Sequence, residues 1–337
     1  MKIFRPTYVA EFKCDGKACG SRCCRDWSVP VDFDTRQKFL QLPDREKLFA
    51  HVTDDNFFRL TDSGDCPFLN ENFLCRLQLE HGEDFLPAIC QSFPRVTYKI
   101  ADDFFLQAMT LTCPVAAIKI LLHDEPITFE VADELNTRMV FDFTKKLSMP
   151  VEKFLSVQRR AIEILQRREL SINRRLKLLC EFFGETSAQV DFDAESNAAA
   201  LAEIFGETYD ANLTVDKKSR LVDSYLTCRN VLAQLREKFS TELENYLVNE
   251  FVMRCYPCAF VGDDKFNCRV FVTSFRLAEF AAVLTALAHG RLTVETFLEM
   301  LCALNDKLAH GKGGMDAIKF FAEVHDTEIF SALMLED

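Results

Sequence analysis

The sequence lacks several features that mark large protein classes. Among its 337 residues are only 11 glycines, 10 prolines and one tryptophan, and no low-complexity run occurs. No Gly-x-Gly-x-x-Gly stretch is present, so the usual signal of a Rossmann-type nucleotide domain is missing. The six histidines form no His-Glu-x-x-His pair. With 48% hydrophobic residues, the composition indicates a folded globular protein rather than a disordered chain.

Basic charge is also scarce. The chain has 40 Lys and Arg against 52 Asp and Glu, a net charge of −12, whereas nucleic-acid binding needs a concentrated basic surface. Met1–Pro6 has no apolar export segment, and the most apolar later stretch, Phe280–Ala288, is shorter than a membrane span. We therefore expect a cytoplasmic protein with neither nucleic acid nor membrane as a partner; its oligomeric state stays open.

Cysteine, by contrast, is abundant, and its distribution is uneven. The chain has 14 cysteines, and the stretch from Cys14 to Cys24 holds four of them among glycine and turn residues. In a reducing compartment, clustered thiols are more often metal ligands or catalysts than disulfides. Packing on one helix face does not explain Cys23 beside Cys24. We predict a metal site built from the N-terminal thiols: Cys14, Cys19, Cys23, Cys24, Cys66, Cys75, Cys90 and Cys113.

The spacing of these cysteines bears on the kind of metal. Zinc is usually held by four thiolates, or by a Cys/His mixture, with fairly regular spacing. The irregular spacing here and the pairs Cys66-Pro67 and Cys113-Pro114 favour an iron–sulfur cluster, 4Fe-4S, because a ferredoxin signature ends in Cys-Pro. Zinc remains the alternative. Thiols beyond four could bind a second metal, contact the ligands or simply pack, and Trp27 could cover the site or lie in an ordinary core.

The remaining cysteines have a simpler interpretation. Cys180 and Cys228 lie on apolar helical stripes and Cys302 lies beside another, where a free cysteine behaves as a small hydrophobe. Cys255-Tyr-Pro-Cys258 has the spacing of a zinc or redox pair, with Cys268 as a possible third thiol, but no nearby histidine or second pair completes a site. We expect packing roles for all of them.

The hydrophobic pattern changes along the chain, which suggests a division into residues 1–124 and 125–337. In the first part, Tyr8–Phe12 alternates weakly, like a strand, and 95–100 with 104–111 predicts a hairpin. A helix is expected from Cys113-Pro114 through Leu122. Beyond Pro126 a 3.6-residue period predicts helices at about 151–165, 172–183, 221–239, 242–254, 274–289, 293–309 and 314–334. The expected fold is mainly α, of the α+β class: a small cysteine-rich domain with a short β-hairpin, followed by a helical body.

The order of these motifs resembles one known family. The four early cysteines and Trp27, then Cys66-Pro67-Phe68-Leu69, Leu74-Cys75, Cys90 and Phe93-Pro94-Arg95, are similar to the cysteine-rich domain of the flagellin lysine N-methyltransferases. The segment Glu244–Asn249 also resembles that family. The resemblance implies transfer of a methyl group from S-adenosylmethionine to lysines of flagellin by an enzyme that carries an iron–sulfur cluster.

Two hypotheses follow. The first is a protein-lysine N-methyltransferase with a cluster-bearing N-terminal domain on a helical body. The second is a non-enzymatic metal-binding or metal-sensing protein whose helical body docks a partner. The sequence assigns no residue to catalysis or to the S-adenosylmethionine pocket; Tyr246 could accept a proton, but a core position is the simpler interpretation of it.

Overall fold

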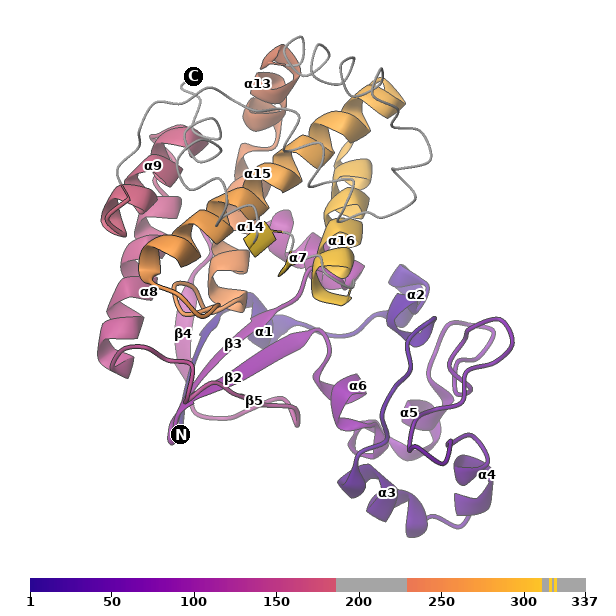
Figure 1. Ribbon diagram of the computed structural model, residues 1–337. Coiled ribbons are helices and arrows are strands. Elements are labelled where there is room, and N and C mark those ends of the chain that lie inside the picture. Colours follow the sequence, from indigo (N-terminus) through magenta and orange to yellow (C-terminus); the bar gives the residue numbers. More distant parts are fainter. Residues whose placement is uncertain (186–228, 311–314, 317, 320–337) are drawn as a thin grey trace. The chain divides into compact units, whose positions relative to one another are not determined.

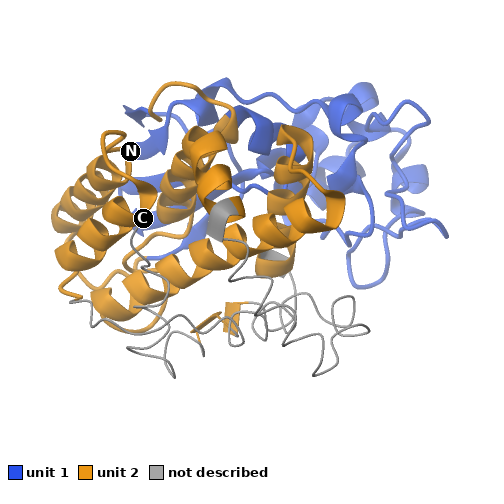
Figure 2. Ribbon diagram, turned by 90° about the horizontal axis from the view of Figure 1, so that it is seen from above, with its two compact units in different colours: residues 1–119, 128–143 blue, residues 120–127, 144–337 orange. Residues whose placement is uncertain are grey.

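The structure, a computed structural model, describes residues 1–185, 229–310, 315–316 and 318–319 (Figure 1). Contacts divide the chain into two units (Figure 2). Unit 1 comprises Met1–Lys119 and Thr128–Phe143, and unit 2 comprises Ile120–Ile127 and Thr144–Asp337. Unit 1 contains a mixed sheet and the cysteines of the predicted metal site, whereas the described part of unit 2 is helical, so the predicted α+β class is confirmed.

The sheet of unit 1 has the strand order β4-β1-β3-β2-β5. Its strands are β1 (Lys2–Pro6), β2 (Arg95–Ala101), β3 (Phe104–Met109), β4 (Phe129–Ala132) and β5 (Phe141–Asp142). The predicted hairpin is confirmed, because β2 and β3 pair antiparallel around the turn at Asp102 and Asp103. Strand β1 pairs parallel with β3 and antiparallel with β4. Segments far apart in the sequence thus meet in one sheet.

One strand was predicted in the wrong place. Tyr8–Glu11 forms the short helix α1, and the N-terminal strand is β1, which precedes it. Tyr8 and Val9 are adjacent and both buried, which the alternating faces of a half-buried strand do not allow. The position of β1 depends instead on its pairing with β3 and β4.

Most of the secondary structure in residues 13–92, which we call the cysteine-rich lobe, consists of short helices. They are α2 (Gly16–Cys19), the 3₁₀ turn η1 (Arg22–Cys24), α3 (Phe33–Leu40), α4 (Arg45–Phe49), α5 (Arg76–His81), the 3₁₀ turn η2 (Glu83–Phe85) and α6 (Ala88–Ser92). The lobe has a small core of its own, in which the rings of Phe58 and Phe68 lie 4.9 Å apart beside the buried Phe39 and Leu77. After β3, helix α7 (Pro114–Leu121) begins at Pro114, as predicted.

Long helices form most of the described part of unit 2. They are α8 (Val151–Leu165), α9 (Ile172–Phe182), α13 (Arg229–Lys238), α14 (Ser240–Met253), α15 (Asp264–His289) and α16 (Val294–His310). The 3.6-residue period therefore located the described helices correctly, apart from the first ten residues of α15. Cys228 and nearly all of the helix predicted at 314–334 lie outside the described residues.

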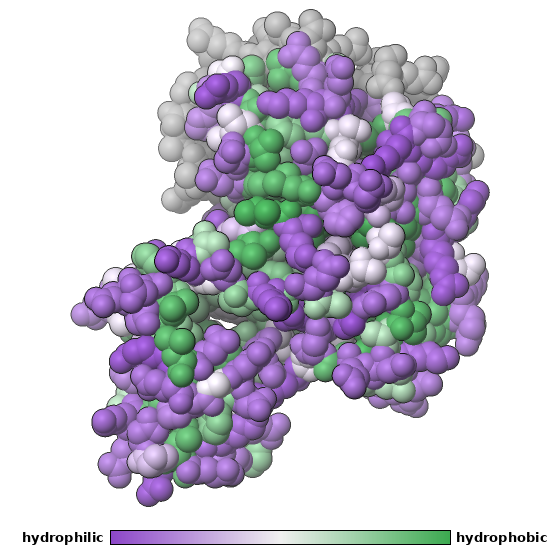
Figure 3. Space-filling model, turned by 180° about the vertical axis from the view of Figure 1, so that it is seen from behind, coloured by the Kyte–Doolittle hydropathy of each residue, from purple (hydrophilic) through white to green (hydrophobic). Residues whose placement is uncertain are grey.

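Most residues of helix α15 are buried. Its N-cap, Asp263, accepts a hydrogen bond from the amide of Phe266 at 2.7 Å, so the helix begins earlier than predicted. Within the part of the chain that the structure describes, α15 is long and apolar enough to cross a membrane by length and composition. Most of that window is buried against the rest of unit 2, as in the core helix of a globular protein. Hydrophilic residues cover most of the face shown in Figure 3, with hydrophobic residues gathered in narrower bands.

Candidate metal centre

The loop with the first four cysteines folds into two tight turns. Asp15 caps α2 by accepting a hydrogen bond from the amide of Ala18 at 3.0 Å. The chain then reverses, and the amide of Ser21 donates to the carbonyl of Gly16 at 2.7 Å. The buried hydroxyl of Ser21 donates to the carbonyl of Phe73 at 2.5 Å. A Cβ at Gly16 would lie 2.7 Å from the Ser21 hydroxyl and 3.0 Å from the Phe73 carbonyl, so this close approach requires glycine.

A second loop brings Cys66 and Cys75 to the first. The amide of Cys66 donates to the carbonyl of Cys24 at 2.8 Å, which joins the two loops through their backbones. Leu69 pairs with Cys75 as an isolated antiparallel bridge, so Cys66-Pro67-Phe68-Leu69 turns back on Leu74-Cys75. Asn70 closes the turn, since its side-chain oxygen accepts from the amide of Leu74 at 3.0 Å. Phe68 anchors the loop in the core of the lobe.

Cys90 lies on α6, and the first turn of α6 is held by Asp32. One carboxylate oxygen of Asp32 accepts the amide of Ala88 at 2.7 Å and the hydroxyl of Thr35 at 2.8 Å. The other accepts the amide of Thr35, at the start of α3, and the guanidinium of Arg138, each at 3.1 Å. A single carboxylate thus joins α3, α6 and the segment that leads to β5.

All eight predicted ligands meet around one cavity of about 150 Å³ in unit 1. They come from α2, η1, α6, the connecting loops and the residue before α7, where the carbonyl of Cys113 accepts the amide of Ala117. Trp27 also lies on the wall, and its ring contacts Phe93 edge-on at 5.5 Å between centroids. The wall is otherwise mostly apolar. The structure therefore brings together every thiol that the sequence grouped, over a separation of 99 residues between Cys14 and Cys113.

Burial changes the acidity of these thiols. It raises the pKa of Cys14 and of Cys66 to about 11 and that of Cys113 to about 12, and it raises the pKa of Cys75 and Cys90 as well. Cys23 and Cys24 share a hydrogen bond, which lowers the pKa of Cys23 and raises that of Cys24. Because most of the thiols are neutral by themselves at pH 7, several thiolates can coexist in the cavity only when a cation compensates their charge.

The thiols lie too far apart for a tight tetrahedral site. Among the described residues, no three cysteine sulfurs lie within 4.8 Å of one another. Zinc with Zn–S bonds of about 2.3 Å holds its thiolates about 3.8 Å apart. The ligands of an iron–sulfur cluster bind different irons and lie farther from one another than ligands of one ion. The donor set fits such a group, and the cavity gives it room.

The described cysteines of unit 2 are buried in its core, as the sequence indicated for Cys180 and Cys302. Cys255 and Cys258 follow α14 and are buried, and the Cys258 sulfur lies 3.4 Å from the hydroxyl of Ser148. Cys268 does not join them: its sulfur lies 3.6 Å from that of Cys180. Within the described residues, these thiols form no group of three within metal-binding distance.

A carboxylate–histidine group escaped the sequence analysis. Asp44, Glu80 and His81 have ligand atoms within 4.8 Å of one another, and His81 Nε2 lies 3.2 Å from an Asp44 oxygen. Asp44 precedes α4 and the other two end α5, so no local spacing marks the group. Glu80 is exposed, and a surface ion pair is a sufficient explanation of the arrangement.

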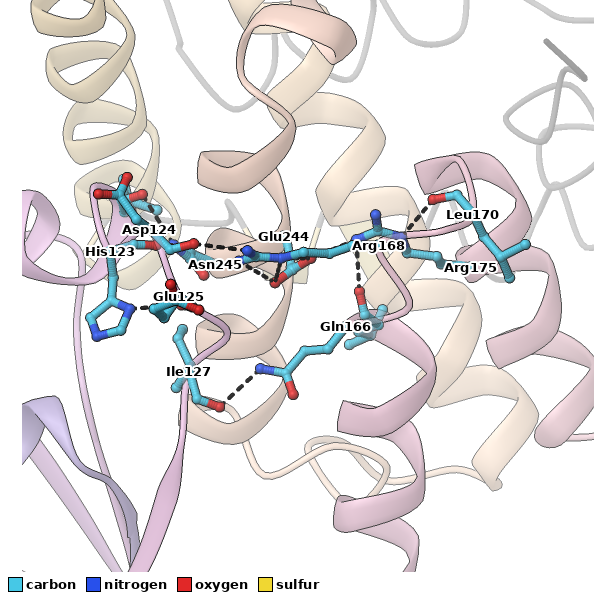
Figure 4. Close-up of polar contacts among 12 residues, drawn as sticks. His123, Asp124, Glu125, Ile127, Gln166, Arg168, Leu170, Arg175, Glu244 and Asn245 are labelled. Atoms are coloured by element: carbon cyan, nitrogen blue, oxygen red, sulfur yellow. Dashed lines mark hydrogen bonds and ion pairs between the residues drawn. The ribbon is translucent and has the colours of Figure 1, made fainter.

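The segment Glu244–Asn249 has a structural role at its start (Figure 4). Glu244 is 1% exposed and forms ion pairs with Arg175 at 2.8 Å and Arg168 at 3.0 Å. The side-chain amide of Asn245 donates to the carbonyls of Leu121 and His123, which fixes residues 120–127 against α14. Tyr246 is fully buried, and burial raises its pKa far above its ordinary value. A proton-accepting role for Tyr246 finds no support in this position.

The fold and site define a class: an α+β protein with a thiol-lined cavity in its N-terminal unit and a helical second unit.

Comparison with known proteins relates the chain to lysine N-methylases. It is 26% identical over 162 residues to the Lysine-N-methylase of Salmonella typhimurium LT2 and to that of Salmonella choleraesuis SC-B67, which covers 43% of this chain and 40% of each relative. It is 29% identical over 132 residues to the Flagellar biosynthetic protein FliU of Salmonella muenchen, 35% of this chain and 76% of that protein.

These matches are to distant relatives, and they support a flagellin lysine N-methyltransferase-like family. The matched region spans well under half the length of the two Lysine-N-methylases. No family model matches the chain, and no solved structure matches it.

Proposed function

We propose that this chain is an S-adenosylmethionine-dependent protein-lysine N-methyltransferase that acts on flagellin and holds an iron–sulfur cluster in the cysteine-lined cavity. The observation that carries the proposal is the convergence of eight thiols from separate loops on one mostly apolar cavity. The similarity to Lysine-N-methylases and to a flagellar biosynthetic protein supports the reaction and the acceptor.

The reaction needs no radical. The amine of lysine attacks the sulfonium methyl group; the carbon–sulfur bond breaks, its electron pair stays on sulfur, and a carbon–nitrogen bond forms. The lysine amine, with an ordinary pKa of about 10.4, must first lose a proton, so the acceptor has to be desolvated or close to a base. A bound cluster would be held by four thiolates from the set Cys14, Cys19, Cys23, Cys24, Cys66, Cys75, Cys90 and Cys113, and its iron would supply a Lewis acid and an anchor for substrate groups.

The protein's own contribution at this site is orientation and exclusion of water. The Ser21–Phe73 and Cys66–Cys24 hydrogen bonds fix the loops, and Asp32 fixes the start of α6. Trp27 and neighbouring aromatic rings make the wall apolar, which strengthens electrostatic interactions inside the cavity.

The test uses anaerobically purified protein. Iron and acid-labile sulfide are measured first, and S-adenosylmethionine binding is then measured by calorimetry. Flagellin from the same source is incubated with both, and its lysines are examined by mass spectrometry for the gain of one methyl group. If the cofactor binds but flagellin gains no methyl group, the acceptor is wrong. Metal without any binding of S-adenosylmethionine would support the metal-binding or metal-sensing alternative, and stoichiometric zinc without sulfide would exclude the iron–sulfur cluster.

A further inference from the structure

The wall of the cysteine-lined cavity is poor in positive charge. Among the described residues that line it are eight cysteines, aromatic and aliphatic side chains and the carboxylate of Asp15, but no lysine, arginine or histidine. Basic residues of the neighbouring loop, such as Lys17 and Arg22, are exposed, so water screens their charge. Thiolates in an apolar cavity interact strongly with any charge that is shielded from water. A cation that lies against the wall and away from solvent therefore has the largest effect on them.

Arg95 lies against this wall. It is the first residue of β2, and the two residues before it, Phe93 and Pro94, line the cavity. Its Cζ lies 5.3 Å from the ring centroid of Phe12, another lining residue, and its Nη2 donates a hydrogen bond to the Phe12 carbonyl at 2.8 Å. Pairing of Arg95 with Met109 of β3 fixes its backbone. The sheet and the wall itself thus hold the guanidinium at the edge of the cavity.

The guanidinium of Arg95 forms no ion pair within the described part of the chain. Arg95 is half-buried, and its Nε is buried without a hydrogen bond. Burial lowers the pKa of Arg95 and the charge of Glu83 opposes this, but Glu83 is exposed and forms no ion pair with it. By contrast, the half-buried Arg5 pairs with Glu130 at 2.7 Å. A charge shielded from water is ordinarily paired, so Arg95 calls for a negative group nearby.

We propose that Arg95 is the counter-charge of the metal group in the cavity: its guanidinium offsets the negative charge of the thiolate ligands and so raises the reduction potential of the iron–sulfur cluster. An arginine stays charged at every physiological pH, so the effect is permanent. Reduction adds one electron and makes the cluster more negative, so a positive charge close to it favours the reduced form. Arg95 is not a ligand and acts only through the cluster. This inference rests on the cluster of the proposed function and not on methyl transfer.

The test is a redox titration of reconstituted protein. Wild type, Arg95→Gln and Arg95→Lys are loaded with iron and sulfide under anaerobic conditions, and each midpoint potential is followed by absorbance and electron paramagnetic resonance. Arg95→Gln loses the charge and is expected to titrate at a more negative potential or to hold less cluster. Arg95→Lys keeps the charge and is expected to load fully, at a potential close to that of wild type. The control Arg45→Gln removes an exposed charge from α4 and should leave the potential unchanged.

The contrast between the Gln and Lys variants separates charge from structure. A wild-type potential in Arg95→Gln would overturn the proposal, as would a shift of the same size in Arg45→Gln. An equal shift or an equal loss of cluster in Arg95→Gln and Arg95→Lys would also overturn it, because the shape of arginine and not its charge would then be the cause. Wild-type protein that takes up no iron and sulfide would overturn the proposed cluster together with this role of Arg95. Neither readout depends on methyl transfer, so a failed methylation assay is a separate result.

Discussion

The carboxylate of Asp32 accepts a hydrogen bond from the amide of Ala88 at 2.7 Å, which joins the N-cap of one helix to the first turn of another. The second helix carries Cys90, two residues after Ala88. The same carboxylate also binds Thr35 and Arg138. A residue that is not itself a candidate ligand therefore determines where one of the ligands lies.

Asp32→Ala is expected to lower the free energy of unfolding by about 1–2 kcal/mol, the usual cost of losing a helix N-cap. In metal-free protein it should also speed alkylation of Cys90, because the first turn of α6 loses its anchor. Chemical denaturation and mass spectrometry measure the two effects. The control is Asp34→Ala, which removes an exposed carboxylate from the same helix. Equal effects of the two variants would contradict the role of Asp32.

The contribution of Asp32 depends on pH. Burial alone would raise its pKa, but hydrogen bonds from Ala88 and Thr35 and the charge of Arg138 lower it overall. Its folded-state pKa is therefore below its unfolded value of about 3.9. The charge-dependent stabilisation is complete above that unfolded value and is lost as the pH falls through the folded-state pKa. The difference between wild type and Asp32→Ala should stay constant from pH 7 to 5 and shrink below about pH 4; a difference that grows on acidification would contradict this.

Gly16→Ala is expected to destabilise unit 1 by about 1–3 kcal/mol, the cost of overpacking, because the added carbon meets the Ser21 hydroxyl and the Phe73 carbonyl. Removing the hydroxyl relieves part of the conflict. The double variant Gly16→Ala/Ser21→Ala should therefore lose less than the sum of the two single losses. Unfolding by denaturant measures all three variants. Additive losses would show that Gly16 and Ser21 do not compete for the same space.

Glu244→Gln is expected to lower the free energy of unfolding by about 3–5 kcal/mol, because it leaves the charge of the buried Arg175 without its partner. The matched control is Glu163→Gln, whose pair with Arg160 is exposed on both sides. That variant should cost less than about 1 kcal/mol. The midpoint of urea unfolding compares the two, and a similar shift for both would mean that the buried pair is not a structural element of unit 2.

Removal of the metal is expected to loosen unit 1 selectively. Since ligand binding is coupled to local folding, metal-free protein should show faster amide hydrogen exchange in residues 14–92 and unchanged exchange in α8 and α14. Aerobic purification alone should leave the site partly or wholly empty, because uncompensated thiols oxidise. Hydrogen exchange with mass spectrometry, before and after chelation, is the measurement. Uniform loosening of both units would contradict a local role.

Local patterns predicted several elements well. The apolar stripes that include Phe154 and Leu176 located α8 and α9, because a 3.6-residue period records which side of a helix is buried. Proline at position 114 marked the start of α7, and Asp102 with Asp103 marked the hairpin turn. Strand β1 was misplaced because its partners lie about 100 residues away, and α1, with four residues, is too short to show a period.

The sequence by itself indicated which thiols belong together, because four cysteines in eleven residues and two later Cys-Pro pairs are not explained by packing on a helix face. It also determined the helical nature of the second part of the chain. Only the tertiary structure decided that the eight thiols share one cavity, that Asp32, Ser21 and Gly16 position them, and that Glu244 and Asn245 are structural. The reason is physical: a side chain's type sets what it can bind, whereas its neighbours depend on contacts between segments that no local pattern records.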